Sequence, residues 1–319
     1  KLTYPTMLKL RPGLAREQLA QLTLLKSIAA GIIRGNFESI LQLRWIKTTG
    51  LFTTAGVEQF MREEVMPSNR FVDYAADLFI VATQLNHSRK VIFGKYSYSP
   101  PAHDLTCQYN NDVSISEACA ASSSMPFVYS PYAIKHGGSA VEGEGDTHYV
   151  DGEVRDTLST HVAMDAGCDL VFASYTHQPY HWKKEIGSLT NHGIPAILIQ
   201  SIYLLIEQKV NQYIYHKESH RNAINAIEKY CKQVNLPEEH AKRILGILEA
   251  ELHHRKDVDT IYIHPNADDS NMFFGEHFSL SPKKLSDLVR SGFRAATETL
   301  KKYEFADRAV TPKVVNAKS

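Results

Sequence analysis

Apolar residues recur along the chain at two spacings, one typical of helices and the other typical of strands. Helical spacing, together with residues that start and stop helices, predicts helices over 14–33, 37–46, 53–65, 114–124, 157–166, 195–218, 220–233, 237–255 and 281–303. Short apolar runs predict strands over 77–82, 91–93, 148–150, 169–173 and 260–264. The polar residues 86–89 predict a hairpin or close strand pair at a sheet edge, and residues 96–111, with two prolines, are expected to form a loop.

The order of these elements predicts an α/β protein. Strand 148–150, helix 157–166 and strand 169–173 follow the rhythm of a βαβ unit, which is typical of a parallel sheet. The three helices between 195 and 255 contain no strand, so we expect them to form a helical insertion or cap. Strand 260–264 then returns the chain to the core.

Composition narrows the class of protein. Lys+Arg and Asp+Glu both number 35, so the formal net charge is zero, which argues against a nucleic-acid partner because such proteins usually carry a basic surplus. The four cysteines (Cys107, Cys119, Cys168 and Cys231) have no paired spacing, which fits a reducing compartment and indicates neither a disulfide framework nor a zinc site. No apolar run reaches the roughly 18–20 residues that span a bilayer. We therefore expect a cytoplasmic or peripheral membrane protein.

One stretch has the pattern of a catalytic site. In 147–153, a β-prone run delivers Asp151 onto Gly152, with a small-residue helix upstream and another helix downstream. A carboxylate at a strand end, beside a glycine that lets the backbone bend sharply, is a common place for a catalytic base in α/β enzymes. Asp-Gly is also a common plain turn. On these two residues alone, the turn is the simpler interpretation.

Other groups of polar residues predict structure more than chemistry. Ser114 and Glu117 form a capping box, and the many small residues up to Ser124 favour tight helix packing over a nucleophilic serine. The chain contains no Gly-x-Ser-x-Gly turn, and the glycines of 137–145 do not match a phosphate-binding loop. Pro179 separates His177 from His181, the adjacent His253 and His254 point to different sides of a helix, and the acidic run 268–276 fails the spacing of a calcium loop. We expect no metal and no cofactor.

Several segments in order resemble one enzyme family. They are Gly50-Leu51-Phe52-Thr53, 78–85, 91–94, 118–126, Tyr149-Val150-Asp151-Gly152 and 166–171. Together they resemble the later two-thirds of a patatin-like phospholipase domain, well over residues 40–175 and more loosely at the last strand and helix. The resemblance implies a three-layer α/β/α sandwich with a mainly parallel central sheet and a Ser–Asp dyad. Asp151 matches the dyad aspartate, Gly152 its supporting turn, and Glu153 departs from the usual glycine or alanine.

The same resemblance sets expectations for the rest of the chain. The oxyanion loop and the serine elbow would lie before Lys1, so we expect a core incomplete at its N-terminus, with no nucleophile in this chain and no activity of the chain alone. The predicted divisions are 1–186 (C-terminal part of the core), 187–257 (helical insertion or cap), 258–305 (final strand and helix) and 306–319 (tail). The implied function is hydrolysis of phospholipid or neutral lipid esters. The alternative is a catalytically silent lipid-binding or scaffold domain.

The expected partners are a lipid ester substrate, a membrane surface contacted peripherally, and the missing N-terminal segment, which could be a separate chain. Segment 195–256 is an expected lid or membrane-contact element, because a lipase takes substrate from an interface. Packing on the core is an equally simple role for it.

Overall fold

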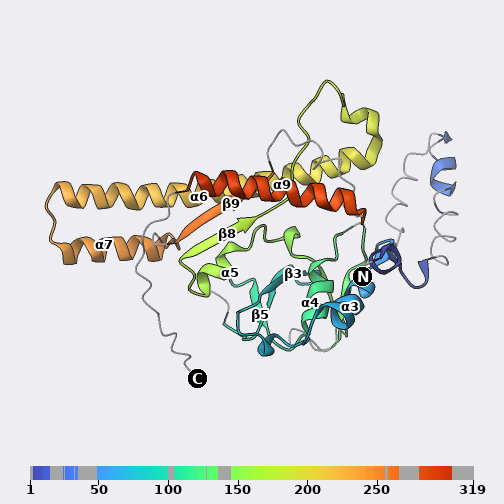
Figure 1. The fold of residues 1–319 in the computed structure, drawn as a ribbon, viewed down its shortest axis with the longest axis horizontal. Helices are drawn as coiled ribbons and strands as arrows, with labels where there is room; N and C mark the ends of the chain where they lie inside the picture. The colour runs from blue at the N-terminus through green and yellow to red at the C-terminus, as the bar shows by residue number, and fades with distance from the viewer. Residues whose placement is uncertain are drawn as a thin grey trace. The chain divides into compact units, whose positions relative to one another are not determined.

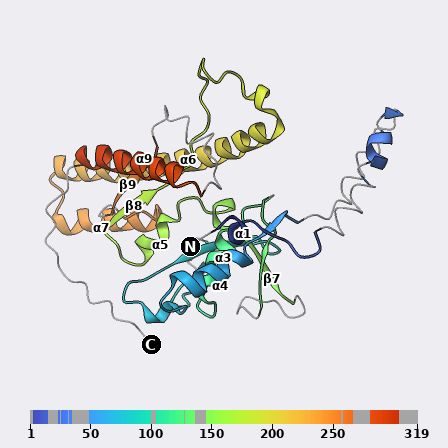
Figure 2. The ribbon, with the colours of Figure 1, turned by 45° about the vertical axis from the view of Figure 1, so that its right-hand side comes forward.

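The structure, a computed structural model, forms two compact units, Lys1–Val162 and Ala163–Ser319, shown as ribbons in Figures 1 and 2. It describes residues 3–14, 24, 26–31, 33–34, 49–99, 104–126, 128–135, 145–255, 258–265 and 280–303. The predicted helix 37–46 and the tail 306–319 lie outside these residues, and the helix predicted over 14–33 lies only partly within them. The divisions predicted at residues 187 and 258 stay predictions.

The first unit is built on a five-stranded sheet. Its strands, in spatial order, are β5 (Cys107–Asn110), β4 (Arg89–Phe93), β3 (Ile80–Gln84), β7 (Thr147–Asp151) and β6 (Tyr132–Ile134). Only β4 and β5 pair in parallel; the other three pairs are antiparallel. The α/β class is confirmed, but the sheet is mixed and not mainly parallel. The four residues between β3 and β4 are too few for a crossover, so β4 must return antiparallel.

The predicted hairpin is present, but it lies inside the sheet and not at its edge. β5 pairs with the outer side of β4, and β7 pairs with the other side of β3. The reason is β5 itself, which forms within residues 96–111, where a loop was expected. Because β5 pairs with β4, the hairpin of β3 and β4 lies in the interior of the sheet.

Helices cover both faces of this sheet. On one face, Ala118 and Ala121 of α4 (Ile115–Ser122) pack against Ala82, Val91 and neighbouring strand residues. On the other face, Val162 of α5 (Thr160–Asp165) packs with Ile92, Cys107 and Tyr109. This gives the three layers expected of an α/β/α core. The alanines on α4 let helix and sheet approach closely, as its composition predicted.

The first unit also contains several shorter elements. They are α1 (Tyr4–Met7), β1 (Lys9–Leu10), β2 (Phe52–Thr53), α3 (Ala55–Phe60), the π-helical turn η2 (Met61–Val65), η3 (Phe71–Asp73) and η4 (Gly152–Val154). α3 and η2 confirm the helix predicted over 53–65, although the N-cap is Thr54 and not Thr53. β1 and β2 form a small antiparallel pair.

The second unit contains a two-stranded parallel sheet of β8 (Leu170–Ser174) and β9 (Asp259–Ile263). Its helices are η5 (Leu189–His192), α6 (Gly193–Gln233), α7 (Glu238–Glu251) and α9 (Pro282–Lys301). The sequence analysis correctly predicted β7, α5 and β8 in this order. However, β7 and β8 do not share a sheet, so the βαβ prediction is wrong. Both sides of β7 are already paired, with β3 and β6, which leaves no edge for β8.

α6 is one continuous helix where two were predicted. No glycine or proline stands between Ala196 and Gln233, so nothing in the sequence interrupts it. Its 41 residues make it about 60 Å long at 1.5 Å per residue. α7 folds back along its distal end and α9 lies alongside it in both views (Figures 1 and 2). In the described part of the chain, no helix is both long and apolar enough to cross a membrane.

Candidate active site

Asp151 is the last residue of β7 and the N-cap of the short helix η4. Its backbone N–H donates to the Ser124 carbonyl at 3.0 Å. Its carboxylate Oδ1 accepts a hydrogen bond of 2.9 Å from the backbone N–H of Glu153. Among the described residues, no group donates to Oδ2 of Asp151. The side chain is therefore held at one oxygen and available at the other.

Burial changes the acidity of this carboxyl group. Loss of solvent raises the pKa of Asp151 above its ordinary value, and the hydrogen bond from Glu153 opposes that rise only in part. A raised pKa makes a carboxylate a stronger proton acceptor. This is the direction that a general base requires.

Gly152 is required at its position because of space. A Cβ on this residue would lie 2.5 Å from the Val81 carbonyl oxygen and 2.9 Å from its carbonyl carbon. The expected reason, a sharp bend open only to glycine, is wrong: Gly152 is not among the residues with positive φ. The backbone of β3 passes directly over the turn instead, and only a residue without a side chain fits below it.

Ser124, at the end of the α4 region, is fully buried. Its hydroxyl donates to the Ala120 carbonyl at 2.8 Å and therefore accepts from the hydroxyl of Thr54 at 3.0 Å. Both hydroxyls are fixed inside the protein, so Ser124 is unsuited to act as a nucleophile. Its carbonyl, by contrast, fixes the backbone of Asp151. Nothing in the sequence pattern assigned it that role.

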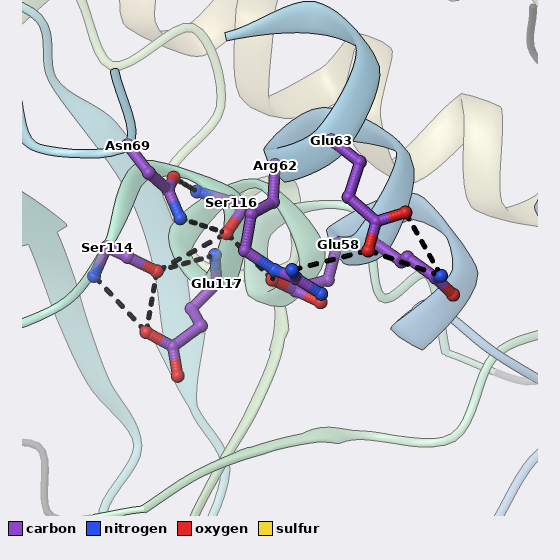
Figure 3. Close-up of polar contacts among 8 residues, drawn as sticks. Glu58, Arg62, Glu63, Asn69, Ser114, Ser116 and Glu117 are labelled. Atoms are coloured by element: carbon purple, nitrogen blue, oxygen red, sulfur yellow. Dashed lines mark hydrogen bonds and ion pairs between the residues drawn. The ribbon is translucent and has the colours of Figure 1, made fainter. Parts of the chain in front are cut away.

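A polar network, drawn in Figure 3, holds the start of α4 against α3. Ser116 donates to Glu58 at 2.9 Å and accepts from the Asn69 amide at 2.8 Å. Arg62 also donates to Glu58 at 2.9 Å. Beside this network, the predicted capping box is complete: the backbone N–H of Glu117 donates to the Ser114 hydroxyl at 3.4 Å, and the backbone N–H of Ser114 donates to the Glu117 carboxylate at 3.2 Å. The network fixes the helix whose far end contacts Asp151.

A second charged cluster anchors the segment after η4. The Lys90 ammonium lies 3.0 Å from a carboxylate oxygen of Asp104, 3.5 Å from one of Asp156 and 3.1 Å from Nε2 of His161. Burial opposes ionisation of Asp104, but hydrogen bonds from Thr106 and Lys90 outweigh it and lower its pKa to about 2. The sequence analysis missed this cluster. A lysine at the head of the apolar run of β4 was the available signal, because a buried lysine needs partners.

The histidines that the sequence analysis rejected as metal ligands lie in the second unit. His177 and His181 line a pocket in the second unit. Within the described residues, no group of three or more His, Cys, Asp or Glu side chains could hold a metal ion. The glycine-rich residues 137–144 and the acidic run 268–276 lie outside the described part of the chain.

The chain was also compared with known proteins. The family model of the patatin-like phospholipases matches residues 12–164, which include the five-stranded sheet, α4 and the Asp151 turn. A search of curated proteins gives no match. The ordered segments that suggested this family from the sequence all lie inside the matched region, except the last of them, which starts just beyond it. Over residues 12–164, the chain is similar to the patatin-like phospholipase family.

Proposed function

We propose that this protein is a lipid acyl hydrolase in which Asp151 is the general base of a Ser–Asp dyad. The observation that carries the proposal is the Asp151 carboxylate itself, fixed by Glu153 at one oxygen and without a donor at the other among the described residues. The nucleophilic serine and the oxyanion donors would come from sequence outside these 319 residues, because no Gly-x-Ser-x-Gly turn occurs within them. The 319 residues alone would then be inactive.

The proposed chemistry is acyl transfer through a covalent intermediate. Oδ2 of Asp151 takes the serine proton as the serine oxygen attacks the carbonyl carbon of a glycerolipid ester. The proton then passes to the oxygen of the leaving alcohol as the ester bond breaks. In the second half, Asp151 deprotonates a water that attacks the acyl-enzyme, and the fatty acid leaves with the serine restored.

The test compares Asp151→Asn with the wild type in the natural full-length protein. We expect fatty-acid release from phospholipid and neutral glyceride to fall by about 10²–10⁴-fold, the usual contribution of a general base. Asp146→Asn is the matched control, since this exposed aspartate lies just before β7 and removes the same charge. Unchanged turnover in Asp151→Asn would contradict the assignment.

The alternative function is a silent lipid-binding or scaffold domain. It is supported by the absence of a Gly-x-Ser-x-Gly turn from the 319 residues. It is also supported by the hydroxyl of Ser124, which is buried and makes two hydrogen bonds. A fluorophosphonate probe that labels serine hydrolases separates the two functions. Labelling of one serine in the full-length protein supports the hydrolase, whereas absent labelling together with retained lipid binding supports the scaffold.

We also propose that the first turns of α6 contact a membrane peripherally. Leu204 and Leu205 are exposed there, Leu205 by 61%, and no charged residue occurs between Gly193 and Ile206. Ile202, in contrast, packs inward against Tyr203 and its neighbours, so it is unsuitable as a probe of membrane contact. Leu205→Asp should reduce co-sedimentation with phospholipid vesicles, and Ile247→Asp on the exposed side of α7 should not. Equal binding of both variants would reject this contact.

A further inference from the structure

A pocket of about 220 Å³ lies in the second unit, at the carboxyl ends of β8 and β9. Tyr175 follows β8 directly and His264 follows β9 directly, and both line it. The two strands are parallel, so their carboxyl ends share one edge of the sheet, which is where open α/β sheets bind ligands. From α6, the side chains of Ile206, Val210 and Ile214 form an apolar wall with helical spacing.

Two polar side chains in this pocket have no hydrogen-bond partner within the described residues. Gln178 is only 7% exposed, and no described residue bonds to its amide. Its amide atoms are not among the fully buried polar atoms that lack a partner; because Gln178 lines the pocket, a ligand bound there can hydrogen-bond to this amide. Glu207, between two residues of the apolar wall, forms neither a hydrogen bond nor an ion pair with any described residue. No aspartate, lysine or arginine belongs to the lining, and Glu207 is its one acidic side chain.

Aromatic rings complete the pocket. The rings of Tyr175 and His264 stack with centroids 5.1 Å apart, and His177 packs edge-on against Tyr203 at 5.4 Å. Burial, and secondly the negative charge of Glu207, raise the pKa of Tyr175, so the phenol stays neutral. Aromatic rings beside a carboxylate attract organic cations.

We propose that this pocket binds a small organic ammonium ion of the class of choline and ethanolamine. Glu207 balances the positive charge, the rings of Tyr175 and His264 contact the polarised methyl or methylene groups, and the wall of α6 contacts the carbon chain. Gln178 takes the hydroxyl or ester oxygen at the other end. An anion is disfavoured by Glu207, and a metal ion lacks the three ligands it needs among the described residues. The site is independent of Asp151 and of the proposed hydrolysis.

The test is calorimetric titration of the full-length protein with choline and with 3,3-dimethylbutan-1-ol, which has the same shape but carbon in place of nitrogen. Choline should bind saturably, and the neutral alcohol about tenfold more weakly or not at all. Glu207→Gln, which keeps the shape of the side chain, should weaken choline binding by a similar factor. Glu239→Gln, a charge removal in the exposed first turn of α7, should leave it unchanged.

The proposal is overturned if choline does not bind, if the alcohol binds equally well, or if Glu207→Gln binds as the wild type does while its thermal unfolding is unaltered. Vesicles then identify the source of the ammonium group. A preference for phosphatidylcholine over phosphatidylglycerol that disappears in Glu207→Gln assigns the pocket to a lipid headgroup. Choline binding without that preference assigns it to a free amine.

Discussion

The contact between Gly152 and the backbone of β3 can be tested with a single methyl group. In Gly152→Ala, the new Cβ would lie 2.5 Å from the Val81 oxygen, 2.9 Å from its carbonyl carbon and 3.3 Å from its Cγ1. Two of these three atoms are backbone. β3 cannot move away easily, because it is hydrogen-bonded to β4 along five residue pairs and to β7 along three.

The expected loss of stability follows from this crowding. Forcing an extra methyl group into a packed interior usually costs about 1–3 kcal/mol. The first unit spans Lys1–Val162, and for a unit of that size each kcal/mol lowers the melting temperature by about 2–4 °C. Gly152→Ala should therefore melt about 2–12 °C lower. It should also lose activity, because a displacement of about 1 Å at a catalytic group can lower the rate by about 10²-fold.

Differential scanning calorimetry of the full-length protein measures the effect. Gly246→Ala is the control: Gly246 is exposed on α7 and a Cβ there meets no atom within 4 Å. Alanine should stabilise that helix by about 0.5–1 kcal/mol. Opposite signs for the two substitutions are expected. If Gly152→Ala melts at or above the wild-type temperature, the close approach of β3 is not the reason for this glycine.

Three further substitutions test the charges and the cap around the site. Asp151→Asn should raise the melting temperature at neutral pH. Because the pKa of Asp151 is raised in the folded protein, the wild type loses stability as this carboxyl group ionises with rising pH. Thermal scans from pH 4 to 8 should therefore show the gain of the variant only at the upper end. The stability of Asp104→Asn should depend less on pH than that of the wild type between about pH 4, the ordinary pKa of an aspartate, and about 2, the folded pKa of Asp104. The reason is that the wild type loses the stability contributed by this carboxylate as the pH falls through that interval. If the urea midpoints of the variant change with pH as those of the wild type do, the prediction is refuted. Ser114→Ala should destabilise by about 1 kcal/mol through loss of the N-cap, whereas Ser123→Ala, on an exposed residue, should change the urea midpoint little.

The features that were predictable from the sequence depend on neighbours within a few residues. The capping box of Ser114 and Glu117 is such a feature, and both of its hydrogen bonds are present. The strand ending at Asp151 is another, because the β propensity of residues 148–150 is a local property. Local energetics decide these elements, and tertiary packing agrees with them.

The pairing of the strands was not predictable in the same way. β5 formed where prolines and tyrosines indicated a loop, because pairing with β4 outweighs its weak local preference. The βαβ prediction failed for a related reason: whether β7 has an open edge depends on β6 and β3, which are distant in sequence. Sheet order is a long-range property, and spacing along one chain does not reveal it.

Glu153 shows how a departure from a family motif can leave a site intact. The family resemblance leads one to expect glycine or alanine at this position. In the structure, what reaches Asp151 from this position is the backbone N–H of residue 153. Every residue except proline supplies that donor. The steric demand falls one residue earlier, at Gly152, where β3 leaves no room for a Cβ. Glu153→Ala should therefore preserve the hydrogen bond and the activity, while Glu153→Pro should remove both. Equal activity of the proline variant and the alanine variant would show that the hydrogen bond from residue 153 to Asp151 is dispensable.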